Sequence, residues 1–359
     1  MRVFTLAAMA VSAAAFGLGS AQPASAAAQK ISGPFVHDNL AVYFIHGESG
    51  GGPVPLTLAE AIEKGAVLVR ETGSVNNLEI ENSGTSDVFI QAGDIVKGGQ
   101  QDRVLTVSMI LPAKSGRVPI GSFCVEHGRW SRRGTEDVRQ FASAAEAMPS
   151  REAKLAMRAP APAPARPGST QAADQHRMAL LREETSRRQA EVWASVAEVQ
   201  KRLSDNLGAP VAAAQSTSSL QLSLENDKLK ATRASYVAGL KDKATDGDIV
   251  GYVIAVNGKI NSADQYPSNG LFQKMWPKML AAGATEAIGE ASKRSAASPS
   301  PAPTVGDVDA FLAGALTGKA DEKPLGTLAR QELRDTDKAL YVEARKADGT
   351  WVHRNYVAK

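Results

Sequence analysis

Short apolar segments separated by polar or glycine-rich breaks dominate the first part of the chain. Between residues 31 and 148 these segments are apolar or alternate between apolar and polar positions, and Gly, Asn, Ser or Pro bounds them. This pattern predicts strands in a partly buried sheet. We expect the strands at residues 41–46, 66–71, 78–82, 87–91, 103–111 and 117–126.

Helical signals accompany these strands. Thr57 and Glu60 form the pattern of a capping box before an apolar run that ends at Gly65, which predicts a helix over residues 58–64. Thr135 is placed to cap a helix over residues 136–148. Pro277 is expected to kink a helical apolar stripe over residues 271–280 or to mark a restart. Further helices are expected at residues 172–207, 225–243 and 307–316.

Two hairpins complete the predicted fold. Asn257-Gly258 separates the apolar run 249–256 from residues 259–262, and Asn-Gly between such runs is a strong hairpin signal. Asp348-Gly349 separates residues 339–344 from residues 351–357 in the same way. The fold class that follows is α+β, with a mainly antiparallel sheet packed with helices and two Pro/Ala-rich linker insertions.

Residues 1–27 have the features of a secretory signal peptide. Arg2 precedes an apolar run, and small residues near Ala26 and Ala28 form the expected cleavage site. The apolar run is interrupted before it reaches the length of a membrane span. The sole cysteine, Cys124, lies far from the cleavage site, so a lipid-attachment cysteine is not indicated. We therefore expect a secreted or periplasmic protein without a stable membrane anchor.

Composition divides the rest of the chain. We expect an α+β domain over residues 31–290 that contains a Pro/Ala-rich linker at 158–170. A second linker over residues 291–304 precedes a helix and a β-hairpin, residues 305–359, which we expect to pack on the domain.

Charge and motifs exclude several classes of function. The 41 basic and 38 acidic residues are interspersed, so no nucleic-acid partner is indicated. The five histidines form no closely spaced pair and no cluster with the single cysteine, so we expect no transition-metal site, although a calcium site made of carboxylates alone stays open. No glycine-rich nucleotide-binding motif occurs in a strand-turn-helix context, and no cofactor is expected.

Polar residues concentrate around one predicted hairpin. If the turn centres between Lys114 and Ser115, antiparallel pairing places Arg103 opposite Glu126 and Leu105 opposite Cys124. The polar groups that flank the two strands then meet at one end of the hairpin, although a register slip of one residue would undo the pairing.

This end of the hairpin is the candidate site. Arg103 and Glu126 are placed to hold a polar ligand, with Arg129 for an anionic group. Cys124 is a candidate nucleophile and Glu126 a candidate general base. The alternative is structural, with Arg103 and Glu126 as a cross-strand ion pair and Cys124 as a small buried hydrophobe. The ligand-binding set is Gln100, Gln101, Arg103, Glu126, Arg129 and Trp130.

One further motif invites comparison with a hydrolase. Residues 47–51 match the Gly-x-Ser-x-Gly nucleophile elbow after a predicted strand. The elbow requires a helix directly after the serine, whereas Gly51, Gly52, Pro53 and Pro55 follow here. We interpret the segment as a flexible glycine loop.

Three segments carry a resemblance to a known family. They are Leu78-Glu79-Ile80-Glu81-Asn82, residues 93–105 with the core Gly98-Gly99-Gln100-Gln101-Asp102-Arg103, and Cys124-Val125-Glu126-His127-Gly128-Arg129-Trp130. The chain resembles the ARG and Rhodanese-Phosphatase-superfamily-associated Protein domain family, with further similarity at residues 189–203, 251–264, 271–280 and, more loosely, 351–356. Asp102 departs from the family pattern, which has asparagine there. The resemblance implies an association with ADP-ribosylglycohydrolase and phosphatase-like proteins and no established activity.

The sequence therefore predicts an exported module with two open functions. The first is binding of a small molecule or of a protein at the polar site around Arg103 and Glu126. The alternative is hydrolysis of a nucleotide-derived, ADP-ribose-like or other polar small molecule, with Arg103 or Arg129 stabilising negative charge. Whether the chain is an enzyme stays open at this point.

Overall fold

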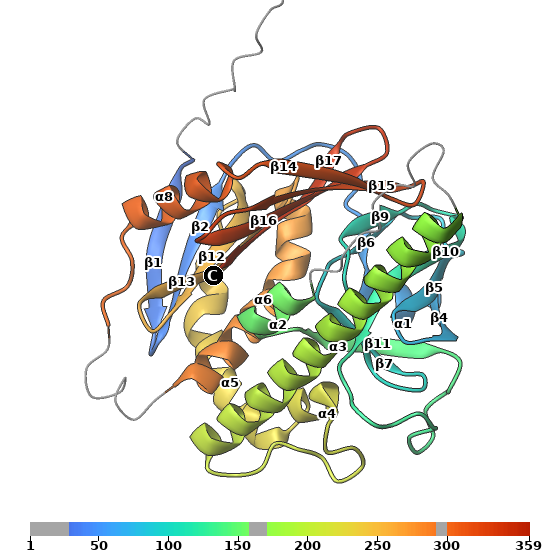
Figure 1. Cartoon of the computed structure of the whole chain (residues 1–359). Coiled ribbons are helices and arrows are strands. Elements are labelled where there is room, and N and C mark those ends of the chain that lie inside the picture. The colour runs from blue at the N-terminus through green and yellow to red at the C-terminus, as the bar shows by residue number, and fades with distance from the viewer. Residues whose placement is uncertain (1–28, 158–170, 292–299) are drawn as a thin grey trace, which may run out of the picture.

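A computed structural model describes residues 29–157, 171–291 and 300–359 (Figure 1). The predicted α+β class is confirmed, because helices pack on sheets whose strand pairs are nearly all antiparallel. The predicted signal peptide, the linker at 158–170 and residues 292–299 of the second linker lie outside the described residues. Within the described part of the chain, no helix is long and apolar enough to cross a membrane.

An eight-stranded sheet joins the two ends of the chain. Its order is β1-β2-β12-β13-β17-β16-β15-β14, and neighbouring strands are antiparallel. The strands are β1 (Ile31–His37), β2 (Leu40–His46), β12 (Ile249–Val256), β13 (Lys259–Gln265), β14 (Ala320–Leu325), β15 (Ala329–Asp335), β16 (Ala339–Lys346) and β17 (Trp351–Ala358). Because β17 pairs with β13, the C-terminal strands continue the sheet that begins near the N-terminus (Figure 1).

Two smaller sheets form the other side of the molecule. The six-stranded sheet has the order β11-β7-β8-β10-β5-β4, and the three-stranded sheet has the order β3-β6-β9. The former consists of β4 (Val67–Ser74), β5 (Asn77–Asn82), β7 (Asp94–Gly98), β8 (Arg103–Leu105), β10 (Gly116–Cys124) and β11 (Phe141–Ala147). The latter consists of β3 (Leu56–Thr57), β6 (Val88–Ile90) and β9 (Met109–Leu111), and β3 and β6 are parallel.

Helices fill the space beside and between the sheets. They are α1 (Leu58–Glu63), α2 (Arg151–Ala156), α3 (Gln171–Leu207), α4 (Leu220–Leu224), α5 (Asp227–Leu240), the 3-10 helix Lys241–Lys243, α6 (Asn269–Glu290) and α8 (Val305–Ala315). The predicted capping box of Thr57 and Glu60 is present at α1. Pro277 lies inside α6, which continues to Glu290 without a restart.

The largest core forms where α6 packs on β12. Phe272 and Trp276 of α6 stack with ring centroids 5.9 Å apart, and Phe44 of β2 contacts Trp276 edge-on at 5.3 Å. The apolar stripe of α6 is therefore buried in the core, as its spacing indicates.

One predicted helix is wrong. Residues 136–148 do not form a helix; Phe141–Ala147 is strand β11, and Phe141 lies opposite Gly98 of β7. The preceding residues accept hydrogen bonds at their backbone carbonyls. The Gly99 N–H donates to the Asp137 carbonyl, and the Glu71 N–H donates to the Arg139 carbonyl. Pairing with β7 thus overrides the helix propensity of an alanine-rich segment.

The predicted hairpin register is also wrong. Residues 103–111 divide into β8 and β9; β8 pairs with β10, whereas β9 pairs with β6. Arg103 lies opposite Cys124, and Leu105 lies opposite Ser122. The first part of β10 pairs with β5 instead, so the turn at residues 112–115 does not set the pairing of β8.

Candidate functional site

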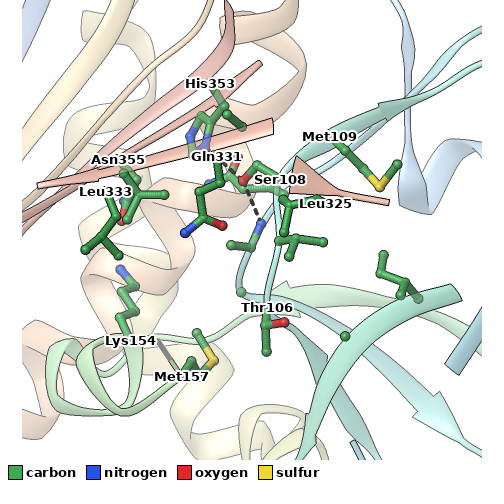
Figure 2. Close-up of a pocket in the computed structure, with 18 of the residues that line it drawn as sticks. Thr106, Ser108, Met109, Lys154, Met157, Leu325, Gln331, Leu333, His353 and Asn355 are labelled. Atoms are coloured by element: carbon green, nitrogen blue, oxygen red, sulfur yellow. Dashed lines mark hydrogen bonds between the residues drawn. The ribbon is translucent and has the colours of Figure 1, made fainter. Parts of the chain in front are cut away.

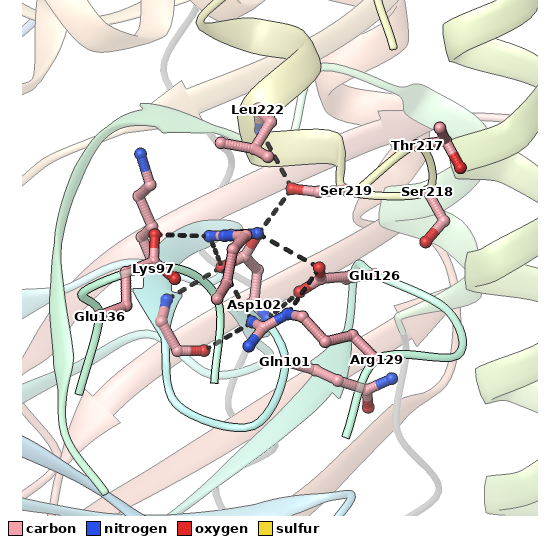
Figure 3. Close-up of polar contacts among 12 residues, drawn as sticks. Lys97, Gln101, Asp102, Glu126, Arg129, Glu136, Thr217, Ser218, Ser219 and Leu222 are labelled. Carbon is pink, nitrogen blue, oxygen red and sulfur yellow. Dashed lines mark hydrogen bonds and ion pairs between the residues drawn. The ribbon is translucent and has the colours of Figure 1, made fainter. Parts of the chain in front are cut away.

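Buried charges cluster where the β7–β8 loop meets the loop after β10 (Figure 3). The Arg133 guanidinium donates to both carboxylate oxygens of Asp102 at 2.8 Å, and to Glu126 Oε1 at 3.2 Å. Arg129 Nε donates to the same Glu126 oxygen at 2.7 Å, and the Asp102 N–H donates to Glu126 Oε2 at 3.0 Å. We call Asp102, Glu126, Arg129, Arg133 and Glu136 the ion network.

The charged groups of the ion network pair with one another. Asp102 and Glu126 have no exposed surface, yet each faces an arginine. Burial by itself raises the pKa of Glu126, but the hydrogen bonds from Arg129 and from the Asp102 N–H lower that pKa below its ordinary value. Arg133 remains charged, because burial lowers its guanidinium pKa but Asp102, Glu136 and Glu126 together raise it by more. Both oxygens of the ionised Glu126 thus already accept hydrogen bonds from the protein. This arrangement does not favour Glu126 as a general base.

The ion network also fixes a neighbouring helix. The Ser219 hydroxyl, which caps α4, donates to Asp102 Oδ2 at 2.7 Å and accepts the Leu222 N–H at 3.1 Å (Figure 3). The β7–β8 loop, the loop after β10 and the start of α4 therefore meet at the Asp102 carboxylate.

Arg103 and Glu126 do not pair with each other. Arg103 is fully buried, and its Nη2 donates to Glu71 Oε2 of β4 at 3.2 Å while Nη1 donates to the Gln101 carbonyl at 2.7 Å. Trp130 lies with its ring centroid 5.7 Å from the Arg103 guanidinium carbon and is 47 % exposed. The predicted cross-strand ion pair is thus replaced by a pair between Arg103 and Glu71.

The remaining predicted residues have different environments. Gln101 is buried, and Gln100 Oε1 is buried without a hydrogen-bond partner among the described residues. Cys124 is also buried, and burial raises the pKa of its thiol to about 12. A thiol with this pKa is protonated at neutral pH, so the structure does not favour Cys124 as a nucleophile.

A separate cavity of about 850 Å³ lies between the eight-stranded sheet and the smaller sheets (Figure 2). Strands of the eight-stranded sheet, among them β15 and β17, contribute to one side, β10 and the segment between β8 and β9 contribute to another, and α2, α3 and α6 also line it. None of the seven predicted candidate residues, which run from Gln100 to Trp130, lines this cavity.

A line of buried polar side chains borders the cavity. Ser108 Oγ lies 3.0 Å from His353 Nδ1, and His353 Nε2 lies 3.0 Å from Asp264 Oδ1. In the second contact the two atoms are close, but the His353 Nε2–H does not point at the Asp264 oxygen. Ser108 is 6 % exposed, and His353 and Asp264 are each 2 % exposed.

Asp264 is held as a carboxylate. The Tyr252 hydroxyl donates to its Oδ2, and Asn355 Nδ2 donates to its Oδ1 at 2.8 Å. Burial raises the pKa of Asp264, but His353, Lys154 and the Tyr252 hydroxyl together lower it, and the net pKa lies below its ordinary value. Asp264 therefore carries a negative charge beside the cavity at neutral pH.

Lys154 of α2 brings a positive charge to the same cavity. Its side chain extends from α2 toward Leu333 and Asn355 (Figure 2). No acidic side chain in the described ranges forms an ion pair with its ammonium group. Much of the remaining lining is apolar and includes Met157, Met279, Leu325, Leu333 and Val342.

Sequence reasoning missed the residues of this cavity. Ser108 and His353 lie 245 positions apart and form no local motif. A signal was nevertheless present, because Asp264 falls in the family-like segment 251–264 and His353 falls in the segment 351–356. The serine of the elbow-like motif, Ser49, has a different role: its hydroxyl accepts the Asn269 N–H at 3.0 Å in an exposed loop.

One group of side chains has the composition of a metal site. His46, Asp246 and Asp248 each offer a ligand atom, and these atoms lie within 4.8 Å of one another. Both ring nitrogens of His46 are already engaged, Nδ1 with Asp248 at 2.7 Å and Nε2 with Ser32 at 2.8 Å. The ring of His46 is therefore accounted for by hydrogen bonds within the protein.

Comparison with known proteins places both regions within one family match. The model described as the ARG and Rhodanese-Phosphatase-superfamily-associated Protein domain matches residues 29–357. No curated protein and no solved structure matches the chain. The match includes the ion network and the residues that line the cavity.

Proposed function

The chain belongs to the ARG and Rhodanese-Phosphatase-superfamily-associated Protein domain family, and from the geometry of its cavity we propose that it binds a small organic anion. The observation that carries this proposal is the cavity of about 850 Å³ that Lys154 enters without a direct ion pair to any residue of the described ranges. Such a volume falls within the range typical of small-molecule sites.

The charge of Lys154 supports an anionic ligand. Lys154 interacts with the buried carboxyl groups of Asp264 and Glu286 at longer range, but it forms no direct ion pair within the described residues, so its ammonium group can bind a carboxylate or phosphate in the cavity. Gln331 and Asn355 add hydrogen-bonding groups nearby, and the apolar lining suits the rest of an organic molecule. Nucleotides and ADP-ribose-like compounds are within this class.

For the ion network we propose a structural function. Its charges are paired among themselves, which supports a role in holding the loop after β10 against α4. Ligand binding through Arg103, Arg129 or Trp130 remains a prediction from the sequence.

Export is proposed on the sequence of residues 1–27. The family match begins at residue 29, directly after the expected cleavage site, which supports a leader outside the domain. Expression of the full gene in a bacterial host, followed by mass measurement of the purified chain, tests this. We expect a mature N-terminus close to residue 27 or 29 in the exported fraction; an intact N-terminus in the cytoplasmic fraction contradicts export.

A binding screen tests the ligand proposal. Melting temperature is measured with a panel of mono- and dicarboxylates, sugar phosphates, nucleotides and ADP-ribose. A ligand present at 100 times its dissociation constant stabilises the native state by about 2.7 kcal/mol, which is measurable as a rise in melting temperature. We expect at least one anion to produce such a rise.

Two matched variants locate the binding. Lys154→Met keeps the length of the side chain and removes its charge, so it should abolish the rise in melting temperature. Lys228→Met removes an exposed lysine of α5 that does not line the cavity and should leave the rise unchanged. The proposal is wrong if no anion binds, or if Lys154→Met binds as tightly as the wild type.

A further inference from the structure

We infer that Ser108, His353 and Asp264 form a nucleophilic relay beside the cavity and that the chain hydrolyses carboxylic esters that carry an anionic group. This inference rests on the proposed function, because the substrate occupies the cavity that Lys154 enters. It differs from the hydrolase alternative drawn from the sequence, which used Glu126, Arg103 and Arg129.

The geometry supplies the contacts that such a relay requires. A nucleophilic hydroxyl must lie within hydrogen-bond reach of a base, and a third group must orient that base. Ser108 Oγ lies 3.0 Å from His353 Nδ1, and Asp264 Oδ1 lies 3.0 Å from the other ring nitrogen. All three residues line the cavity.

The contacts around these residues favour the protonation state that the relay requires. The Ala92 N–H donates to Ser108 Oγ at 2.9 Å, so the serine hydroxyl proton is free to point at His353. Asp264 is a carboxylate beside His353 Nε2 and favours the tautomer with the proton on that nitrogen. His353 Nδ1 then presents its lone pair to the serine hydroxyl.

Packing holds the imidazole in place. Its ring contacts Phe89 edge-on, with centroids 5.8 Å apart, and Tyr266 at 5.2 Å. His353 belongs to β17, Asp264 belongs to β13, and the two strands pair directly. A base fixed on a rigid strand and shielded by aromatic rings is preorganised for proton transfer.

The reaction is written in two steps. Ser108 Oγ attacks the ester carbonyl carbon, its proton passes to His353 Nδ1, and the carbon–oxygen bond to the alcohol breaks as that proton moves to the leaving oxygen. Water then attacks the acyl-serine and gives a proton to His353 Nδ1. The acyl–Oγ bond breaks, Ser108 regains the proton, and a carboxylic acid is released.

An alkyl fluorophosphonate tests the nucleophile in the full chain, because this reagent forms a phosphonyl-serine bond at an activated serine and releases fluoride. Intact mass and peptide mapping identify the labelled residue. We expect one label per chain on Ser108. Ser108→Ala lacks the oxygen that forms the phosphonyl bond and should abolish labelling, whereas Ser49→Ala should label as the wild type does.

A second variant keeps the result interpretable if Ser108→Ala is poorly folded. Ser108→Cys preserves a side chain of similar shape and should react faster with iodoacetamide than the buried Cys124 does. Melting temperatures of both variants establish that they are folded.

The positioning role of Asp264 is tested by the pH profile of labelling. The ionisable groups around His353 are Asp264, Tyr252, Tyr266 and Lys154. Asp264→Asn removes the carboxylate beside His353 Nε2, so the pH profile of labelling should differ from that of the wild type. A purely structural role leaves the profile unchanged.

The binding and labelling experiments separate the two proposals. Absence of label on Ser108 in a folded chain that still binds an anion overturns the relay and leaves the binding function intact. Label on Ser108 without binding of any anion, or binding that does not depend on Lys154, overturns the anionic ligand class. Label on another serine also overturns the relay.

Discussion

The ion network predicts a large loss of stability when Arg133 is replaced by methionine. Arg133→Met keeps an apolar side chain of similar reach and removes both hydrogen bonds to Asp102 and the bonds to Glu126 and Glu136. Asp102 retains the Gly98 N–H at 2.9 Å and the Ser219 hydroxyl at 2.7 Å. Because removal of one partner from a buried ion pair costs about 3–5 kcal/mol, we expect the unfolding free energy to fall by about that amount.

Equilibrium unfolding in urea at pH 7, followed by circular dichroism, measures this loss. Arg132→Met is the matched control, because Arg132 is exposed and its side chain donates only to the Thr135 carbonyl, at 3.2 Å. We expect the control to change the unfolding free energy by less than about 0.5 kcal/mol.

The loss should also depend on pH with a defined sign. The pKa of Glu126 is lowered in the folded chain, so this group stabilises the fold above its ordinary pKa of 4.5 and loses that effect as pH falls toward the folded pKa. A protonated Glu126 carries no charge for Arg133 to balance. The difference in unfolding free energy between wild type and Arg133→Met should therefore shrink below pH 4.5. A loss under about 1 kcal/mol at pH 7 would refute a stabilising role for the ion network.

Three further outcomes follow from buried groups and tight turns. Cys124, with a thiol pKa of about 12 and no exposed surface, should react with a disulfide reagent at pH 8 only after denaturation, and rapid labelling of the native chain would contradict its burial. Gly99→Ala should destabilise by about 2–4 kcal/mol, since its Cβ would lie 2.3 Å from the Phe141 ring at a φ of +54°, whereas Gly134→Ala, at +56° with open space around it, should cost only about 1–2 kcal/mol; equal losses in urea unfolding would refute the clash. Glu286→Gln should stabilise the chain increasingly as pH rises above 4.5, because burial raises the pKa of this carboxyl and its ionisation opposes folding; a stability difference independent of pH would exclude this.

Local signals were sufficient for much of the fold. Strand β12 begins and ends at the predicted residues 249 and 256, and α3 ends at the predicted Leu207. Strand β12 is almost wholly apolar, the second half of α3 has buried residues at three- and four-residue spacings, and a glycine turn follows each element. The Thr57–Glu60 capping box was also readable, because all of its hydrogen bonds lie within four consecutive residues.

The failures occur where a distant partner decides the conformation. Residues 141–147 form a strand because β7 pairs with them, and Arg103 lies opposite Cys124 because most of β10 pairs with β5. A pattern within one segment contains no information about which neighbour satisfies its backbone groups. Arg133, the centre of the ion network, had no periodic or motif signal at all.

The sequence by itself therefore determined the α+β class, the family and most elements, because hydrophobic period, turn residues and helix caps act over a few positions. It also located a polar cluster, but not the contacts within it. Only the tertiary structure decided that Arg103 pairs with Glu71 and that Glu126 is neutralised by Arg129 and Arg133. It alone brought Ser108 and His353 together across 245 positions, because pairing of β17 with β13 carries the last strand of the chain to the cavity.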